Sequence, residues 1–328
     1  MPPLSFMFKI GNIGIEGKVI LAPMAGVTSL AYRDFMKPFG VALTVTEMVS
    51  DCGLIYENKK TLDYIKTSNI ERPVAIQLFG NDAETIIKAM KIVEKENPNF
   101  DIFDINLGCP VPKVTKAGSG SALLKNPAKL QDMFTKICAS TSKPVTAKIR
   151  LGWSDETINF LDNIKALENA GVKAIGIHAR TTSQLYSGKP RYELLKDLRK
   201  KMSIPLFVSG DIYSLDDAIN ALNITGADAV MVARGGVGNP TLVKQINHFY
   251  KTGERLPNAS LAENIEYLKQ FSDMLINEKG EYRAMSLLRG IAPKFLDGFP
   301  GMKPYKNMLA QSLTTKESLY RILDQINK

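Results

Sequence analysis

The sequence predicts an α/β protein in which a (β/α)₈ TIM barrel is followed by a small all-helical C-terminal domain. Short apolar runs rich in strand-forming residues alternate with helix-like stretches between Val19 and Ala233. Polar residues recur at the C-terminal ends of these runs, as expected if the strand ends converge on one mouth. The alternation stops after about Tyr250, and this change predicts the second domain.

Eight runs have the length and composition of strands in a parallel sheet, because most of them are apolar on both faces. These runs are Val19–Met24, Leu43–Met48, Pro73–Phe79, Ile102–Leu107, Pro144–Ile149, Ala174–His178, Pro205–Ser209 and Ala229–Ala233. Eight strand–helix units within about 250 residues match a closed barrel in number and size.

Helices are expected between the strands, at Ala83–Lys95, Pro127–Ala139, Thr157–Ala170 and Leu215–Leu222. Gly171 and Gly226 are placed to end two of them, and Asp155 and Ser214 are placed to cap two N-termini.

An open, doubly wound sheet is the alternative architecture, and polar residues distinguish the two. Each of the following lies near the C-terminal end of a different expected strand: Glu47, Gln77, Asn106, Lys148, His178, Ser209 with Asp211, and Arg234. A closed barrel brings such residues to one mouth, whereas an open sheet spreads them along a wide edge. The pattern therefore favours the barrel.

The expected domains are a barrel at residues 1–250 and a helical domain at 251–328. Thr252–Pro257 has the composition of a linker. Beyond it, apolar residues at helical spacing form two stripes, the second interrupted by Pro293: Ile265, Leu268, Phe271 and Leu275, then Tyr282, Met285, Leu288 and Phe295.

The charge balance favours a polyanionic partner. Lys and Arg number 42 against 33 Asp and Glu, a formal charge of +9, and basic surfaces bind phosphates with release of counterions. A merely solvated, lysine-rich surface is the alternative. Cys52, Cys109 and Cys138 are too few for a disulfide framework, and neither a signal peptide nor a membrane span is recognisable. We therefore expect a cytoplasmic protein that contacts no membrane. We also expect it to be a monomer.

The most informative stretch is Asp104–Pro110, an apolar strand that runs into a Gly-Cys-Pro turn. Gly108 and Pro110 break the strand where the thiol of Cys109 stands, which favours a thiol at the mouth over a cysteine in the core. A thiol with a pKa of about 8.5 is protonated at neutral pH, so Cys109 is suited to donate a proton. The glycine-rich segment 118–121 is expected to be a flexible loop that closes over a substrate. No Cys/His spacing predicts a metal site.

Two further features point to a cofactor with an anionic ring and a phosphate. Lys148 ends an apolar strand, where its ammonium would stabilise a reduced flavin; a snorkelling lysine is the alternative. The turns at Ser209–Asp211 and Ala233–Gly238 follow the last two strands, and barrels often bind phosphate through these loops. His178 also ends a strand, although a lone histidine is more often part of the core.

The sequence resembles the tRNA-dihydrouridine synthase family over nearly its whole length, and most closely the bacterial branch with a helical C-terminal domain. The resemblance is carried by Leu21–Thr28, Asn106–Pro110 with the downstream Gly120–Leu124, Lys148–Arg150, and His178–Thr181. The family usually has Asn at the position of Ser209 and Gly at those of Ala179 and Ala233, so retuned cofactor contacts are expected there.

The resemblance implies FMN as the cofactor, NADPH as the electron donor and tRNA as the partner. Cys109 would donate the proton to C5 of uracil, Asn106 would hold the target base, and Arg180 would face the RNA. The implied FMN-binding residues are Pro23, Met24, Ala25, Gln77, Lys148, His178, Ser209, Gly210, Asp211, Ala233 and Arg234.

The expected reaction is reduction of the uridine C5=C6 bond in folded tRNA. Because this bond is conjugated to the C4 carbonyl, hydride should reach C6 and a proton C5. The alternatives are a flavin barrel acting on a free pyrimidine, as dihydroorotate dehydrogenases do, a dihydrouridine synthase acting on ribosomal RNA, and an RNA-binding barrel without catalysis.

Overall fold

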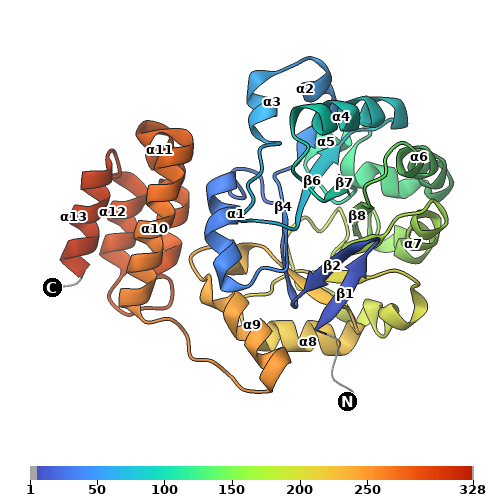
Figure 1. Cartoon of the computed structure of the whole chain (residues 1–328). Helices are drawn as coiled ribbons and strands as arrows, with labels where there is room; N and C mark the ends of the chain where they lie inside the picture. The colour runs from blue at the N-terminus through green and yellow to red at the C-terminus, as the bar shows by residue number, and fades with distance from the viewer. Residues whose placement is uncertain (1–5, 327–328) are drawn as a thin grey trace.

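The computed structural model describes residues 6–326 and contains a closed barrel of eight parallel strands (Figure 1). The strands are β3 (Val19–Leu21), β4 (Leu43–Val45), β6 (Val74–Phe79), β7 (Ile102–Asn106), β8 (Val145–Arg150), β9 (Ala174–His178), β10 (Leu206–Ser209) and β11 (Ala229–Val232). Pairing runs in chain order, and β11 pairs with β3 while β4 pairs with β6. All eight expected strands and the barrel are confirmed.

The second barrel strand is broken after β4. A short strand, β5 (Val49–Ser50), continues the pairing with β6 beyond the break. Glu47 lies in the gap between β4 and β5 and is buried. The break therefore places a carboxylate at the carboxyl end of the barrel.

A hairpin that the sequence analysis did not predict covers the amino end of the barrel. Its strands are β1 (Met7–Ile10) and β2 (Ile13–Glu16), joined by a two-residue turn in which Gly11 has a φ of 59°. The Phe8 ring lies 5.5 Å from that of Phe207 inside the barrel. A Gly-Asn pair between apolar residues is a hairpin signal, but strands of four residues carry too little periodicity to be recognised alone.

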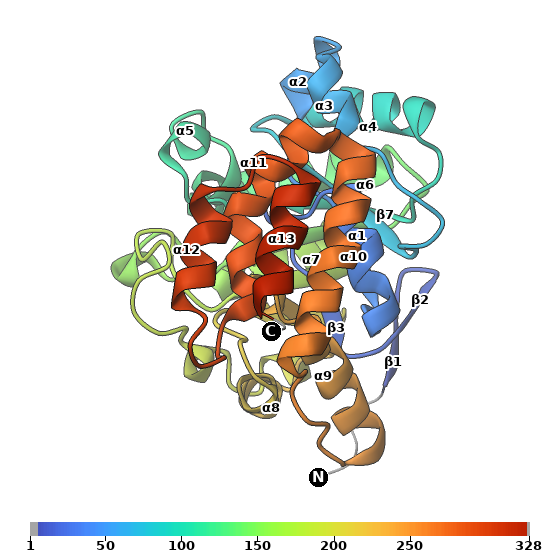
Figure 2. The same ribbon diagram turned by 90° about the vertical axis from the view of Figure 1, so that its left-hand side faces the viewer.

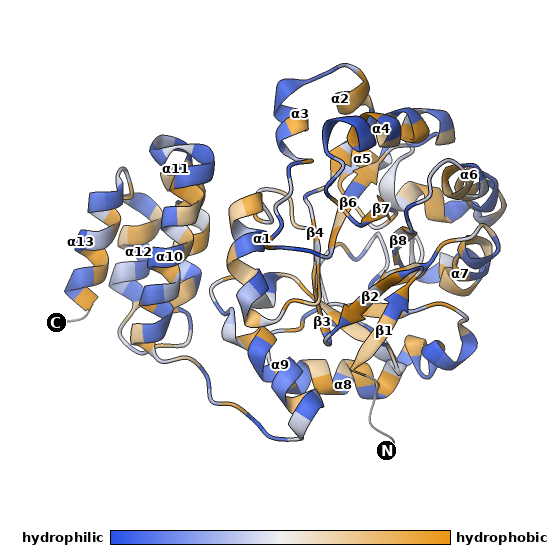
Figure 3. Cartoon of the chain, in the orientation of Figure 1, coloured by the Kyte–Doolittle hydropathy of each residue, from blue (hydrophilic) through white to orange (hydrophobic). Residues whose placement is uncertain are grey.

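Most of the outer helices bury one face in the core, and they carry both hydrophobic and hydrophilic residues (Figure 3). They are α1 (Leu30–Met36), α2 (Asp51–Ile55), α3 (Lys59–Asp63), α4 (Ala83–Glu96), α5 (Pro112–Thr115), α6 (Pro127–Ala139), α7 (Phe160–Asn169), α8 (Leu215–Thr225) and α9 (Thr241–Thr252). All four expected helices are present. Between β9 and β10 only two 3₁₀ turns occur, Tyr192–Leu195 and Leu198–Lys201.

The helix caps correct one prediction and confirm another. Ser214 caps α8 in a reciprocal arrangement with Asp217, and Gly226 ends α8 with a φ of 70°. Asp155 does not cap α7: Ser154 caps a separate 3₁₀ turn, and α7 begins only at Phe160. The serine is better placed because it precedes the turn.

Helices α10 (Leu261–Lys279), α11 (Glu281–Ile291), α12 (Lys303–Gln311) and α13 (Lys316–Ile326) form a bundle beside the barrel (Figures 1 and 2). We call these helices and their loops the helical tail. The ring of Phe271 in α10 lies 5.5 Å from those of Tyr32 and Phe35 in α1, so aromatic packing joins the tail to the barrel. Tyr282, expected in an apolar stripe, is 90% exposed because it lies on the outer side of α11. No helix within residues 6–326 has the length and apolarity to cross a membrane.

Replacing Phe271 by Ala should lower the free energy of unfolding by about 3–5 kcal/mol, because it leaves a cavity between α1 and α10. Tyr282→Ala is the matched control: its ring is exposed, so we expect a change within about 0.5 kcal/mol. Denaturant titration of both variants checks this, and a near-zero effect of Phe271→Ala would contradict tight docking of the tail.

Candidate functional site

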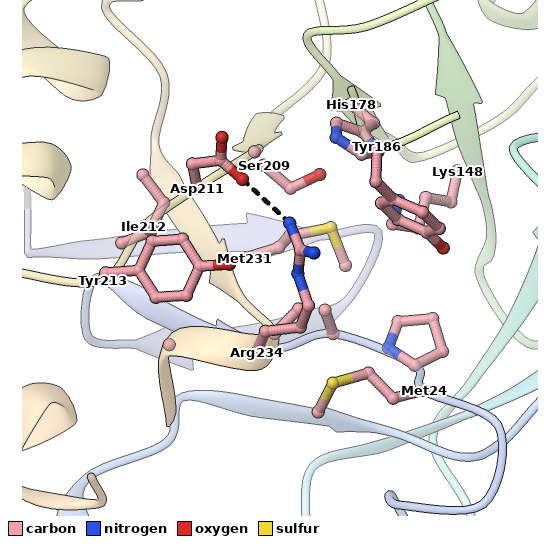
Figure 4. A pocket seen from close by; sticks show the side chains of 15 residues that line it. Met24, Lys148, His178, Tyr186, Ser209, Asp211, Ile212, Tyr213, Met231 and Arg234 are labelled. Carbon is pink, nitrogen blue, oxygen red and sulfur yellow. Dashed lines mark hydrogen bonds and ion pairs between the residues drawn. The ribbon is translucent and has the colours of Figure 1, made fainter. Parts of the chain in front are cut away.

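A cavity of about 160 Å³ opens at the carboxyl ends of the barrel strands (Figure 4). Nine of the eleven residues predicted to bind a cofactor line it, namely Pro23, Met24, Lys148, His178, Ser209, Gly210, Asp211, Ala233 and Arg234. Ala25 is exposed beyond the rim, and Gln77 is fully buried beneath it. Barrel closure therefore unites residues from five segments of the chain.

One end of the cavity has unused polar groups. The Ser209 hydroxyl is buried and has no hydrogen-bond partner within the described residues. The backbone N–H groups of Asp211 and Ile212, which lie outside any strand or helix, also make no hydrogen bond in that part of the chain. A hydroxyl and free N–H groups converging on one place can bind an anion.

Two glycines shape this end. Gly210 has a φ of 134°, and a Cβ there would lie 2.8 Å from the ring of Pro190. A Cβ on Gly235 would lie only 1.9 Å from the Ile212 carbonyl oxygen. Glycine at position 235 lets the turns after β10 and β11 approach each other, and glycine at position 210 lets the turn after β10 approach Pro190 in the segment after β9.

The carboxylate of Asp211 connects two arginines. The Arg234 guanidinium donates to Asp211 Oδ1 at 2.9 Å and lies between the rings of Tyr186 and Tyr213, 5.1 and 5.8 Å from their centroids (Figure 4). Arg180 pairs with the same carboxylate. Asp211 therefore fixes the guanidinium of Arg234 at the rim and the guanidinium of Arg180 below it.

The structure contradicts the expectation that Arg180 faces the RNA. Its side chain is 1% exposed, and it also donates to the carbonyl oxygens of Ser187 and Gly188 at 3.1 and 2.6 Å. Arg180 instead holds the loop after β9 against Asp211.

Lys148 projects a cation into the cavity. Its ammonium makes no hydrogen bond or ion pair within residues 6–326, while burial and the nearby Arg150 lower its pKa to about 8. Burial also lowers the pKa of His178 well below its usual value, helped by the surrounding cations, so its imidazole is neutral at pH 7. The cavity thus combines an ammonium that has no direct ion pair among the described residues with a neutral hydrogen-bonding ring.

Cys109 lies half-buried in a turn that is fixed through its backbone. Its N–H donates to Asn106 Oδ1 at 2.9 Å, and its carbonyl accepts from the N–H and hydroxyl of Ser121 at 3.2 and 2.9 Å. Ser121 is fully buried and belongs to a 3₁₀ helix, Gly120–Lys125. The segment 118–121 is therefore a support for the cysteine turn, not the flexible loop that its glycines suggested.

A chain of buried side chains orients Asn106. Its Nδ2 donates to Gln77 Oε1 at 2.8 Å, and Gln77 Nε2 donates to Asp104 Oδ2 at 2.6 Å. Burial raises the pKa of the Asp104 carboxyl, although bonds from Thr146 and Gln77 oppose that rise. Gln77 therefore acts on the site through Asn106, which keeps one amide N–H for another partner.

Three residues near the cavity were missed or left without a role: Arg150, Tyr186 and Tyr213. Arg150 is 1% exposed and donates to the carbonyl oxygens of Gly108, Thr181 and Leu185, each at 2.8 Å. It therefore links the cysteine turn to the loop that carries Tyr186. The only sequence signal for Tyr186 and Tyr213 was the presence of an aromatic residue in a glycine-containing loop after a barrel strand.

The other two cysteines lie elsewhere. Burial raises the pKa of Cys138, on α6, to about 11, and Cys52 is an exposed residue of α2. Neither lines the cavity.

The cavity is continuous with a larger cleft of about 910 Å³ between the barrel and the helical tail. Met24, Tyr213, Arg234 and Gly235 line both spaces. The tail contributes polar and basic residues to the cleft, including Lys294. A large ligand lying in the cleft could thus place one small group in the cavity.

Comparison with known proteins agrees with this arrangement. A family model described as "Dihydrouridine synthase (Dus)" matches residues 20–328. The chain is 35% identical to a "Probable tRNA-dihydrouridine synthase" of Rickettsia conorii over 95% of each chain. It is 33% identical to "tRNA-dihydrouridine synthase B" of Shewanella oneidensis over 88% of this chain and 89% of that protein.

Solved structures support the fold alone. An old yellow enzyme homologue from Zymomonas mobilis aligns with a TM-score of 0.55 at 13% identity, covering 80% of this chain and 96% of the other. Histamine dehydrogenase from Rhizobium sp. 4-9 aligns with the same TM-score and identity over 83% of this chain and 51% of the other. From the family match over nearly its whole length, we conclude that the chain belongs to the dihydrouridine synthase (Dus) family.

Proposed function

We propose that this protein is an FMN-dependent tRNA-dihydrouridine synthase that uses NADPH as its electron donor and acts in the cytoplasm as a monomer. The main support is the combination of groups at the carboxyl ends of the barrel strands. The cavity there has an anion-binding end at Ser209 and the unpaired ammonium of Lys148, and the neighbouring turn after β7 holds the thiol of Cys109. The relatives named as tRNA-dihydrouridine synthases support the same activity.

The cavity fits the chemistry of FMN. The orphaned Ser209 hydroxyl, the free N–H groups of Asp211 and Ile212, and Arg234 would hold the phosphate. The ammonium of Lys148 would lie against the flavin ring, where it stabilises negative charge on the reduced form. Pro23 and Met24 would support the ring from below.

Different residues of the chain contribute to different parts of the reduction of uridine. When bound, FMN reduced by NADPH supplies a hydride for C6 of uracil. The Cys109 thiol holds the proton that C5 requires, and the backbone bonds to Asn106 and Ser121 keep that thiol in place. The remaining amide N–H of Asn106 is available to bind the base. Neutral His178 can donate a hydrogen bond without adding a second charge beside Lys148.

The continuous cleft favours a polynucleotide over a free pyrimidine, because a free base would not need a space of about 910 Å³ beside the cavity. The test is to incubate the purified protein and NADPH with tRNA lacking dihydrouridine, with ribosomal RNA and with free uridine. A two-hydrogen mass increase in tRNA alone supports the proposal. Activity on free uridine or on ribosomal RNA alone would overturn it.

Cys109→Ala should separate the two half-reactions. Reduction of FMN by NADPH should continue, while dihydrouridine formation should fall by about 10² to 10⁴, the usual contribution of a general acid. Single-turnover oxidation of pre-reduced protein by tRNA measures the second step. Cys52→Ala, which removes an exposed thiol away from the cavity, is the control and should behave like wild type. Full turnover in Cys109→Ala would remove this residue from the mechanism.

Lys148→Met should weaken FMN retention yet stabilise the flavin-free protein at pH 7. Because the pKa of Lys148 is lowered from 10.5 to about 8 by folding, the unfolded chain binds its proton more tightly, and the charged form opposes folding. The stability gain of the variant should be fully present below pH 8 and vanish as the pH rises to about 10.5. Melting curves across this range and FMN titration check both parts; unaltered FMN affinity would contradict the role of Lys148.

Arg283 and Lys303 are exposed tail residues that form no ion pair within the described chain, whereas Lys294 and Lys306 both pair with Asp297. Removing both free cations by Ala substitution should weaken tRNA binding and flatten the slope of log affinity against log salt by about one unit per lost phosphate contact. Lys9→Ala, on the hairpin at the opposite end of the barrel, should leave the slope unchanged. An unaltered slope in the double variant would place the RNA elsewhere.

A further inference from the structure

The turn beneath the cavity, residues 23–29, belongs to no strand or helix. Pro23 and Met24 line the cavity from this turn. Inside it, the Val27 N–H donates to the Met24 carbonyl at 3.1 Å, and the Thr28 hydroxyl bonds to the Met24 backbone. Such a turn keeps its position only if groups outside it hold it.

Two barrel residues hold the turn. The Gly26 N–H donates to Glu47 Oε2 at 2.5 Å, and Arg33 Nη1 donates to the Thr28 carbonyl oxygen at 2.8 Å. Arg33 is itself fixed by a buried ion pair with Glu71 at 2.6 Å. The barrel thus supports the turn at its middle and near its end.

The third support comes from the helical tail. Glu278, in the last turn of α10, accepts the backbone N–H of Ala31 at 2.8 Å, where the turn passes into α1. Its other oxygen pairs with Lys279 at 2.8 Å. Burial opposes ionisation of Glu278, but these bonds outweigh it and hold the pKa of the carboxyl below its usual value.

This carboxylate has no equivalent elsewhere in the interface. Within residues 6–326, Glu278 makes the only hydrogen bond between α10–α13 and the barrel. The rest of this interface includes aromatic packing, such as Phe271 on Tyr32, and a close approach of Gly238 to the Lys294 backbone. Apolar packing fixes the distance between α10 and α1, whereas a hydrogen bond to a backbone N–H fixes the position of a particular peptide. Glu278 is therefore the tail residue that fixes the position of the C-terminal end of the turn.

We propose that Glu278 is a positioning residue for the flavin site, so that the helical tail supports flavin binding and the first half-reaction as well as the RNA. This inference rests on the proposed function, because it takes FMN as the ligand above the turn. Loss of the Glu278 carboxylate would release the end of the turn and loosen Pro23 and Met24 beneath the ring.

The test uses full-length protein, reconstituted with FMN, in three variants. Glu278→Ala should weaken FMN binding on the order of tenfold, the effect of losing a charged hydrogen-bond acceptor, alter the visible absorbance of bound FMN and slow its reduction by NADPH without RNA. Glu278→Gln keeps an acceptor for the Ala31 N–H, so it should restore most of the affinity. Glu281→Ala is the matched control, since Glu281 accepts the Lys316 N–H at 2.7 Å within the tail itself.

The outcomes separate this inference from the proposed function. Failure of the wild-type protein to bind FMN would overturn the proposed function and the inference with it. Wild-type FMN binding together with an unchanged affinity and spectrum in Glu278→Ala would overturn the inference alone. Equal losses of FMN affinity in Glu278→Ala and Glu281→Ala would also overturn the inference, because they would reflect a general loss of stability of the tail. Melting temperatures of all variants identify that case.

Discussion

Closure of the barrel is the constraint on which the site depends. Pairing of β4 with β6 and of β11 with β3 joins the two ends of the strand series. Because all eight strands are parallel, their carboxyl ends then face one mouth. Residues as distant in sequence as Met24, Lys148 and Arg234 line a single cavity for this reason. The hairpin closes the opposite end, so the mouth is where a ligand can enter.

Charge is the second organising feature. Burial lowers the pKa of His178 well below its usual value, and the charges of Lys148, Arg150, Arg180 and Arg234 lower it further, so the imidazole is neutral. Asp211 pairs with Arg180 and Arg234, but Lys148 has no ion-pair partner within the described residues. Burying an unpaired cation costs stability unless a ligand supplies the counter-charge. The mouth therefore suits an anionic ligand, and the buried Ser209 hydroxyl, which has no partner among residues 6–326, is available to bind one.

The sequence predicted the barrel and most of the cavity lining, because apolar periodicity and the ends of strands are local signals. It did not predict the role of Arg180, since a sequence pattern does not show whether an arginine reaches solvent or folds back onto Asp211. The support of the turn by Glu278 was also invisible, because Glu278 and Ala31 are 247 residues apart and meet only after the tail has docked. Serine and glycine residues at 118–121 suggested mobility, yet packing beneath Cys109 overrides that local preference.

If this mouth reduces uridine in tRNA, the dihydrouridine content of cellular tRNA depends on the protein. The most direct measurement is a map of dihydrouridine in tRNA and ribosomal RNA from cells that lack the protein, compared with the same cells carrying a restored copy. At least one tRNA uridine should stay unmodified without the protein and regain the modification with it, while ribosomal RNA is unaffected. An unchanged tRNA map, or a loss confined to ribosomal RNA, would contradict this expectation.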